Sequence, residues 1–201
     1  VVFQPHISWI VIITVLTVFL FFSAKISWQS FICGILILAI AFLILSALMT
    51  LVMPLLPETV SGYVSYDYVL TRLNIFLSPE NMGEDELFQT RQSVNAIGSG
   101  GLTGVGIGNS IQKWGYLPMQ YNDYVYSIIA EELGFIGAIS ILFLFFAYFI
   151  AGIRISLKAE NIFSSLLAFG FSLIIIVQAM LNIGVATNVL PPTGISLPFF
   201  S

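Results

Sequence analysis

The chain has 201 residues, of which 58% are hydrophobic and only 8% are charged, and its mean hydropathy is +1.01. A soluble globular domain needs more charge to cover its surface, so this composition indicates an integral membrane protein. The apolar residues fall in long unbroken runs, which favours membrane-spanning helices over a membrane β-barrel. The net charge of −4 leaves no basic patch, which argues against nucleic acid as a partner.

Two apolar runs open the chain. The first predicted span is Ile7 to Ala24, at about 18 residues long enough to cross a bilayer core of about 30 Å. Lys25 marks a short turn, and the second predicted span covers residues 30–53. Because the chain starts at Val1 without an initiator Met and ends as if another helix followed, we expect a fragment of a larger membrane protein.

A long polar section, residues 55–122, follows these two spans. Within it, Tyr66 to Phe76 has apolar residues at helical spacing, which is typical of an amphipathic segment on the membrane surface. Residues 78–86 predict a turn and a helix start, and residues 89–97 predict a short helix that the following glycines end.

Two further apolar runs complete the chain. The third predicted span, residues 124–153, corresponds to about 45 Å of helix, which exceeds the bilayer core. We therefore expect its first turns to stand in the loop region. The fourth predicted span covers residues 163–185 and precedes a proline-rich segment.

The short loops predict the orientation. Lys25 lies in one short loop, and Arg154 and Lys158 lie in another, on the same face of the membrane if the four spans alternate. The positive-inside rule therefore predicts that both loops are cytoplasmic and that the long loop 55–122 is extracytoplasmic. The predicted fold is an all-α polytopic membrane protein, a single membrane domain with four spans and one long outer loop.

Glycine recurs through residues 98–108, in the run GSGGLTGVGIG. The run lacks the GxGxxG spacing, the GK[ST] ending and the preceding strand of nucleotide-binding loops. The favoured interpretation is a turned segment whose backbone approaches a helix or a ligand closely. An alternative stays open, because exposed backbone N–H groups of such a loop can bind a diphosphate.

Three carboxylates lie at the start of the third span. Asp123 stands between the polar loop and the apolar helix, which predicts either a helix N-cap or a general base with raised proton affinity. Glu131 and Glu132 lie about two turns further on, and ionisable side chains at membrane depth indicate function. Adjacent helical residues point about 100° apart, so we expect only one of the two glutamates to face a cavity.

Other polar residues give weaker signals. His6 is the only histidine, and neither a metal site nor a Ser-His-Asp arrangement can be built around it. We expect no cofactor, and leave a divalent cation open. Cys33, in an apolar run, is interpreted as a small buried hydrophobe. Gln178 and Asn182, one turn apart on one face, predict interhelical hydrogen bonds or the lining of a polar cavity.

Four stretches of the chain follow one another with a recognisable order and spacing: QPHIS at 4–8, RQSVNAIGSGGLTGVGIGNSIQKWGYLP at 91–118, NDYVYSIIAEELGFIG at 122–137 and NIGVATNVLPPTGISLPFFS at 182–201. In them the chain resembles the SEDS (shape, elongation, division and sporulation) family of FtsW/RodA/SpoVE-like membrane glycosyltransferases, and it leans toward the division or sporulation branch. The resemblance covers nearly all of this chain but about half of a family member. It implies that the four spans are the sixth to ninth of a presumed ten helices.

The resemblance also implies an activity: polymerisation of lipid II, the undecaprenyl-diphosphate disaccharide-pentapeptide, into peptidoglycan strands at the outer face of the bacterial cytoplasmic membrane. The family's essential aspartate falls on Asp123, with the implied role of general base for the acceptor sugar's 4-hydroxyl. The implied partners are a class B penicillin-binding protein transpeptidase and other membrane proteins of the divisome or elongation complex. Met119 and Asn122 depart from the family's usual glutamate and threonine, which affects how the acceptor would be positioned.

Around this aspartate we take as candidate substrate-binding residues Arg91, Gln92, Ser99, Gly100, Lys113, Glu132, Asn182 and Thr193. Lys113, Arg91 or the glycine-run amides could stabilise a leaving diphosphate.

Two other functions are kept as alternatives. A lipid II flippase would use Gln178, Asn182 and Glu131 to carry the head group across the membrane, and a non-catalytic division scaffold would use the loop 55–122 as a docking surface. The ionisable residues gather toward the outer face, whereas a flippase needs polar groups through the whole bilayer depth. This distribution favours the enzyme.

Overall fold

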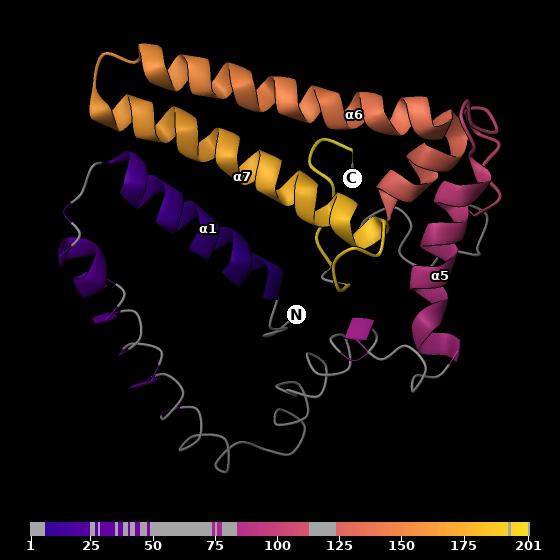
Figure 1. Cartoon of the computed structure of the whole chain (residues 1–201), viewed down its shortest axis with the longest axis horizontal. Helices are drawn as coiled ribbons and strands as arrows, with labels where there is room; N and C mark the ends of the chain where they lie inside the picture. Colours follow the sequence, from indigo (N-terminus) through magenta and orange to yellow (C-terminus); the bar gives the residue numbers. More distant parts are fainter. Residues whose placement is uncertain are drawn as a thin grey trace.

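The computed structural model of the chain is all-α in the residues that it describes (Figure 1). These residues are 7–24, 27, 29–34, 36–37, 40, 43–44, 48, 74, 76–77, 84–112, 124–192 and 194–200. Their long helices are α1 (Ile7–Ser23), α5 (Glu84–Ser99), α6 (Val125–Lys158) and α7 (Ile162–Ala186).

The hairpin of α6 and α7 is the longest feature of the described chain. Both helices are long and apolar enough, by length and composition, to cross a membrane. The predicted spans 124–153 and 163–185 lie almost wholly within them, and α6 continues to Lys158. The turn ends at Asn161, whose side chain caps α7 by accepting a hydrogen bond from the backbone N–H of Ser164 at 2.8 Å.

The first half of the chain is described in part. The predicted first span corresponds to α1, and the described residues within the predicted second span, 30–53, are helical. Phe21 of α1 meets Phe31 edge to face, with ring centroids 5.3 Å apart. Cys33 is exposed, so its prediction as a buried side chain is wrong, because an apolar helix in a membrane can face lipid as well as protein.

The polar section contains one long described helix. The short helix predicted at residues 89–97 is confirmed as α5, which begins earlier, at Glu84, and ends at Ser99, just before the paired glycines. Of the predicted amphipathic segment 66–76, only residues 74 and 76 are described, so that prediction lies outside the described residues.

Small residues let the long helices approach one another closely. A Cβ atom added to Gly152 of α6 would lie 1.8 Å from the Ser172 hydroxyl oxygen of α7, so the two helices touch at this point. On the other side of α7, Gly170 faces Leu16 and Leu20 of α1 at ordinary contact distance. Glycine and serine at helix contacts are typical of membrane proteins, where close packing replaces the hydrophobic effect.

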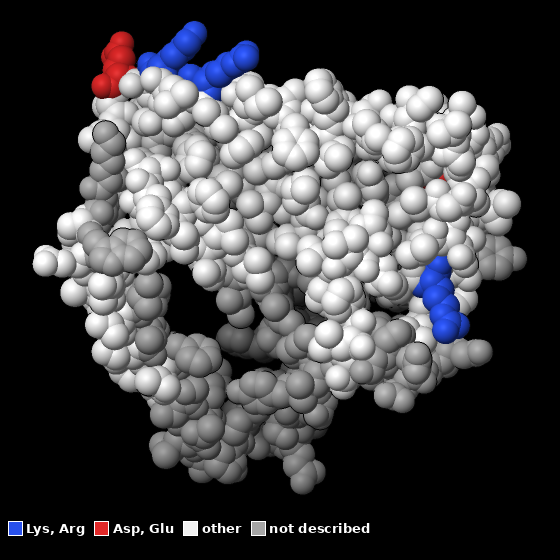
Figure 2. All heavy atoms as spheres, viewed as in Figure 1, with Lys and Arg blue, Asp and Glu red and all other residues white. Residues whose placement is uncertain are grey.

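On the face shown in Figure 2, the charged side chains of the described residues lie at the two ends of the helix layer. The end of α6 carries Arg154 and Lys158, and Glu160 follows in the turn. The face between the ends shows a wide uncharged surface (Figure 2). The C-terminal end of α1 lies beside the α6–α7 turn (Figure 1), as alternating spans require. This distribution is the one expected of helices that cross a bilayer.

A cluster of hydroxyl groups joins α5, α6 and α7 at the opposite end. The hydroxyl oxygens of Ser93 and Ser127 are 2.6 Å apart, and Ser93 donates to the backbone carbonyl of Ala186 at 2.7 Å. Both serines are fully buried. We call Ser93, Ser127 and the Ala186 carbonyl the serine junction, and it fixes α5 against the hairpin.

Substitution of Ser93 by alanine should destabilise the protein by about 1 to 2 kcal/mol, because the buried Ser127 hydroxyl and the Ala186 carbonyl both lose their partner. The change would be measured as a lower melting temperature of the full-length protein in detergent. Ser140→Ala is the matched control, since that exposed serine bonds only to Ile136 of its own helix. Equal melting temperatures for the two variants would show that the serine junction does not stabilise the protein.

Candidate functional site

Helix α6 is broken at Gly134. This residue has φ 68° and ψ −168°, a conformation that residues with a Cβ atom avoid. Beyond the break, the N–H groups of Phe135 and Ile136 donate to the carbonyls of Gly101 and Leu102 at 2.9 and 3.3 Å. The section after the break is roughly 36 Å of helix, long enough by itself to cross a bilayer core of about 30 Å. That the first turns of α6 stand in the loop region stays a prediction.

The carbonyls before the break are bonded by the same loop. The N–H groups of Val105 and Gly106 donate to the carbonyls of Glu131 and Glu132, each at 3.0 Å. We call residues 100–109 the glycine loop. It thus supplies partners for four backbone groups that an unbroken helix would have paired internally.

Glycine is required on both sides of this contact. A Cβ atom on Gly100 would lie 2.1 Å from the Ala130 carbonyl oxygen, and one on Gly104 would lie 2.1 Å from the carbonyl oxygen of Glu132. The interpretation of the glycine run as a close backbone approach is therefore confirmed, and the neighbour is α6. The N–H groups of residues 104–106 already donate to backbone carbonyls, so they are not free to bind a diphosphate.

The two glutamates before the break have different surroundings, because adjacent helical residues point about 100° apart. Glu131 is 1% exposed, and its carboxylate accepts hydrogen bonds from the Ser110 hydroxyl and from the Ile111 N–H, the latter at 3.1 Å. Glu132 is half-buried, and its Oε1 has no hydrogen-bond partner among the described residues. Glu131 therefore ties the end of the glycine loop to α6.

Asp123 lies outside the described residues, whereas the next residue, Tyr124, is described. Tyr124 is 3% exposed and packs with Val185, Ile128 and Leu190. It is also the N-cap residue of α6, without a side-chain cap hydrogen bond. The interpretation of Asp123 as a helix cap lies, like Asp123 itself, outside the described residues.

The candidate residues on α5 are spread along the helix. Arg91 is exposed and Gln92 half-buried, while Ser99 donates to the carbonyl of Ala96 in its own helix at 2.9 Å. Gly100 packs against α6 as described. Lys113 and Thr193, like Met119 and Asn122, lie outside the described residues. The substrate-binding role of these residues stays a prediction.

The polar pair on α7 holds the C-terminal segment. The Asn182 side chain donates to the carbonyl of Ile195 at 2.7 Å, and that of Gln178 donates to the carbonyl of Ser196 at 3.1 Å. Asn182 is 1% exposed. Both acceptors belong to a non-helical segment, so these two bonds join α7 to the C-terminal segment and not to another helix.

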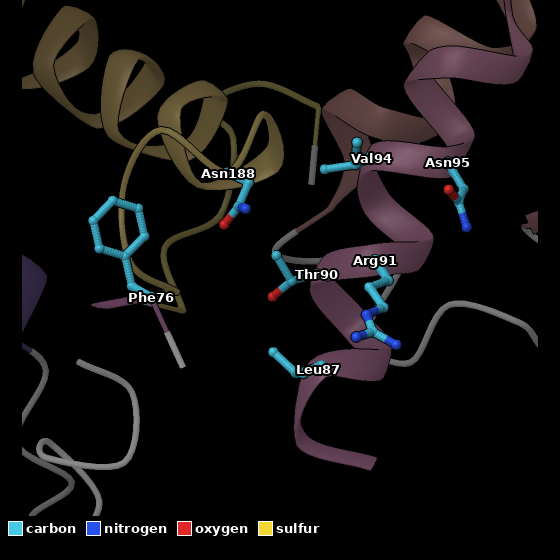
Figure 3. A pocket seen from close by; sticks show the side chains of 7 residues that line it. All are labelled: Phe76, Leu87, Thr90, Arg91, Val94, Asn95 and Asn188. Atoms are coloured by element: carbon cyan, nitrogen blue, oxygen red, sulfur yellow. The ribbon is translucent and has the colours of Figure 1, made fainter. Parts of the chain in front are cut away.

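A cavity of about 320 Å³ opens beside the serine junction. It is lined by Phe76, Leu87, Thr90, Arg91, Val94, Asn95 and Asn188. Figure 3 shows Leu87, Thr90 and Val94 pointing from α5 toward the side where Asn188 and Phe76 lie. Among these lining residues, only Arg91 was a candidate from the sequence. Asn95 could have been found from the sequence as well, because it lies four residues after Arg91 and therefore on the same face of a helix.

The whole chain, residues 1–201, matches the family of cell cycle proteins that comprises FtsW, RodA and SpoVE. Stage V sporulation protein E of Bacillus subtilis (strain 168) is 45% identical over 148 residues, covering 70% of this chain and 40% of that protein. The probable peptidoglycan glycosyltransferase FtsW of Coxiella burnetii is 37% identical over 201 residues, covering 98% of this chain and 50% of that protein. The chain thus spans about half the length, or less, of these curated relatives.

The fold has a counterpart among solved structures. A chain described under "Structural coordination of polymerization and crosslinking by a peptidoglycan synthase complex" superposes with a TM-score of 0.63 at 24% identity. The alignment covers 98% of this chain and 50% of that one. At 24% identity, this similarity shows that the two chains share a fold.

Substitution of Gly134 by alanine should separate the glycine loop from α6. The new Cβ atom would lie 2.3 Å from the Gly104 nitrogen, in addition to the strain of the positive φ. We expect a loss of more than about 2 kcal/mol and faster deuterium exchange across residues 101–106. Gly108→Ala is the control, because Gly108 has φ 82° but nothing within 4 Å of a Cβ. If deuterium exchange across residues 101–106 is the same in the two variants, the pairing between the glycine loop and α6 does not control that exchange.

Substitution of Glu131 by alanine should release the backbone of residues 110–112. A hydrogen bond to a charged acceptor contributes about 1.5 to 3 kcal/mol, so exchange of the Ile111 amide should rise by roughly tenfold or more. Glu132→Ala is the control, since the buried Oε1 of that carboxylate has no hydrogen-bond partner among the described residues. If exchange at these residues rises equally in both variants, the carboxylate of Glu131 does not hold the segment.

Proposed function

Because the chain belongs to the FtsW, RodA and SpoVE family of cell cycle proteins, we propose that it is part of a peptidoglycan glycosyltransferase of the cytoplasmic membrane that polymerises lipid II. The observation that carries this proposal is the match over all of residues 1–201, together with relatives named as probable peptidoglycan glycosyltransferases. All four sequence stretches that resemble the family lie within the matched residues 1–201.

The proposed reaction uses Asp123 as general base. Its carboxylate takes the proton of the acceptor sugar's 4-hydroxyl while that oxygen attacks the anomeric carbon of the lipid-linked donor. The new glycosidic bond forms as the bond from the anomeric carbon to the diphosphate breaks, and the electron pair leaves with undecaprenyl diphosphate. Asp123 then returns the proton to solvent.

The anchoring of the segment around Asp123 supports this role. Residues 113–123 follow the Ser110–Ile111 pair, which Glu131 holds, and precede Tyr124, which packs on α7. The described residues on both sides of the segment are thus attached to the first turns of α6 or to their neighbours. A general base needs a fixed position relative to its substrate, because misplacement by about 1 Å can cost about a hundredfold in rate.

The flippase alternative gains no support from the polar residues of α7. The side chains of Gln178 and Asn182 donate to backbone carbonyls of residues 196 and 195. Glu131 likewise has two donors. These groups hold the protein together rather than line a path for a head group.

A transpeptidase partner is part of the proposal. The similar solved structure is described as a peptidoglycan synthase complex that coordinates polymerisation and crosslinking. We extend this to a class B penicillin-binding protein that crosslinks the strands this protein would make. The uncharged face of the helix layer in Figure 2 offers a surface for a partner's membrane helix.

Asp123→Asn should lower lipid II polymerisation by at least about a hundredfold, because the amide cannot accept the proton. The assay would use the full-length protein with its transpeptidase partner in detergent or nanodiscs. Glu160→Gln, in the turn at the opposite end of the hairpin, is the control and should leave the rate unchanged. Equal rates for native protein and Asp123→Asn would remove Asp123 as the base. No product from a folded native complex would favour transport or scaffolding.

A further inference from the structure

The glycine loop carries large apolar side chains on its surface. Ile107 is 81% exposed and Leu102 is 70% exposed, and Ile111, just after the loop, is exposed as well. No charged residue occurs in the sequence from Gln92 to Gln112. A group of exposed aliphatic side chains without charge among them indicates an interaction surface.

The pairing with α6 fixes the depth of this loop relative to a bilayer. Figure 1 shows the loop beside the end of α6 that lies away from the α6–α7 turn, where the N–H of Phe135 donates to the carbonyl of Gly101. From Phe135 to Arg154, the next charged residue after the break, α6 has roughly 30 Å of helix, which matches the hydrocarbon core. With Arg154 at one boundary of the core, Phe135 and the loop bonded to it lie at the other.

The backbone of the loop is bonded as this depth requires. A backbone group in contact with hydrocarbon must find its partner within the protein. The N–H groups of residues 104–106 donate to backbone carbonyls, and the carbonyls of Gly101 and Leu102 accept from α6. The side chain of Asn109 donates to the carbonyl of Val105 at 3.3 Å. These bonds lower the free-energy cost of moving the loop into the boundary of the bilayer.

An apolar groove of about 550 Å³ lies between the loop, the end of α5 and the break in α6. Its walls are formed mainly by Ile97, Leu102, Tyr126, Phe135, Ala138 and Ile139. The two hydroxyl groups in its lining already have acceptors: Tyr126 donates to the carbonyl of Ala138 at 3.3 Å, and Thr187 donates to that of Ile183 at 2.8 Å. The groove therefore has the volume of a small-ligand pocket and the chemistry that suits a hydrocarbon chain.

The groove is continuous with the exposed apolar surface of α6. Phe135 and Ile139 line the groove and are also exposed, and Phe143, a further four residues on, is 71% exposed. Residues four apart share one face of a helix, so this row leads from the groove toward the middle of the span. The carboxylate of Glu131 is buried and bonded, and presents no charge to the row. A lipid of the surrounding bilayer can therefore extend a chain along α6 and into the groove.

We propose that the glycine loop is immersed at the boundary between headgroups and hydrocarbon, with Leu102 and Ile107 among the acyl chains, and that one acyl chain of a bilayer phospholipid occupies the groove. This surface gives the loop a second role besides its pairing with α6, because it sets the depth at which the first turns of that helix stand. The proposal concerns the membrane and does not depend on the proposed function.

Spin-label accessibility tests the immersion of the loop in the full-length protein, in nanodiscs of phosphatidylethanolamine and phosphatidylglycerol. A nitroxide attached to Ile107→Cys, with all other cysteines replaced by serine, should have a severalfold higher ratio of oxygen to nickel-chelate accessibility than one attached to Glu160→Cys. Glu160, in the α6–α7 turn, is the control for water, and Phe143→Cys is the control for hydrocarbon. Nickel accessibility at residue 107 equal to that at residue 160 overturns the proposal. Protection from both reagents also overturns it, because that result indicates a covering protein.

A phospholipid with a diazirine on its acyl chain tests the occupant of the groove. On irradiation in the same nanodiscs it should label Leu102, Phe135 or Ile139. Gly98→Trp should lower this labelling severalfold and leave that of Phe143 unchanged, because Gly98 lines the groove and a Cβ atom there meets nothing within 4 Å, so the indole can fill the space.

Three results of the labelling experiment overturn the proposal. The first is the absence of label in the groove of the native protein, and the second is equal labelling of the groove in native protein and Gly98→Trp. The third is loss of the groove label when undecaprenyl phosphate is added, which would assign the groove to an isoprenoid chain. Equal melting temperatures of native protein and variant confirm that Gly98→Trp is folded.

Discussion

The backbone pairing between the glycine loop and the break in α6 is the interaction on which this end of the protein depends. A helix in a membrane must bond its own backbone groups, because lipid offers them no partner. Breaking α6 at Gly134 leaves two carbonyls and two N–H groups without helical partners, and the glycine loop bonds all four. The pairing requires backbone-to-backbone contact, so the glycines at 100, 104 and 134 are a steric necessity.

The same pairing organises the polar groups around it. With the glycine loop held on α6, Ser110 and Ile111 come within hydrogen-bond reach of the Glu131 carboxylate, which would otherwise be an uncompensated buried charge. The serine junction repeats this arrangement between three helices. Both features place a buried polar group where a neighbouring element supplies its partner. The result is a rigid platform at the end of the helices where the sequence predicts the extracytoplasmic side.

The elements of the fold were predictable where the sequence carries a strong local signal. Long apolar runs predicted α6 and α7, and the glycines after Ser99 predicted the end of α5, because these signals depend on hydrophobic length and backbone freedom alone. Predictions of what surrounds or contacts a given side chain were less accurate. Cys33 was expected to be buried, and Asn182 to bond another helix, whereas the first is exposed and the second bonds the carbonyl of Ile195. One-dimensional patterns identify a polar residue without identifying what faces it.

The sequence by itself determined that this protein is a helical membrane protein, that it carries the motifs of its family, and that its glycine run is a site of close backbone contact. These follow from composition, length and residue order, which folding does not alter. Only the tertiary structure decided which backbone the glycines meet, that Glu131 rather than Glu132 is fully buried and bonded, and that Arg91 lines a cavity with Asn188. Such pairings join residues far apart in the chain, and their geometry exists only after the helices have packed.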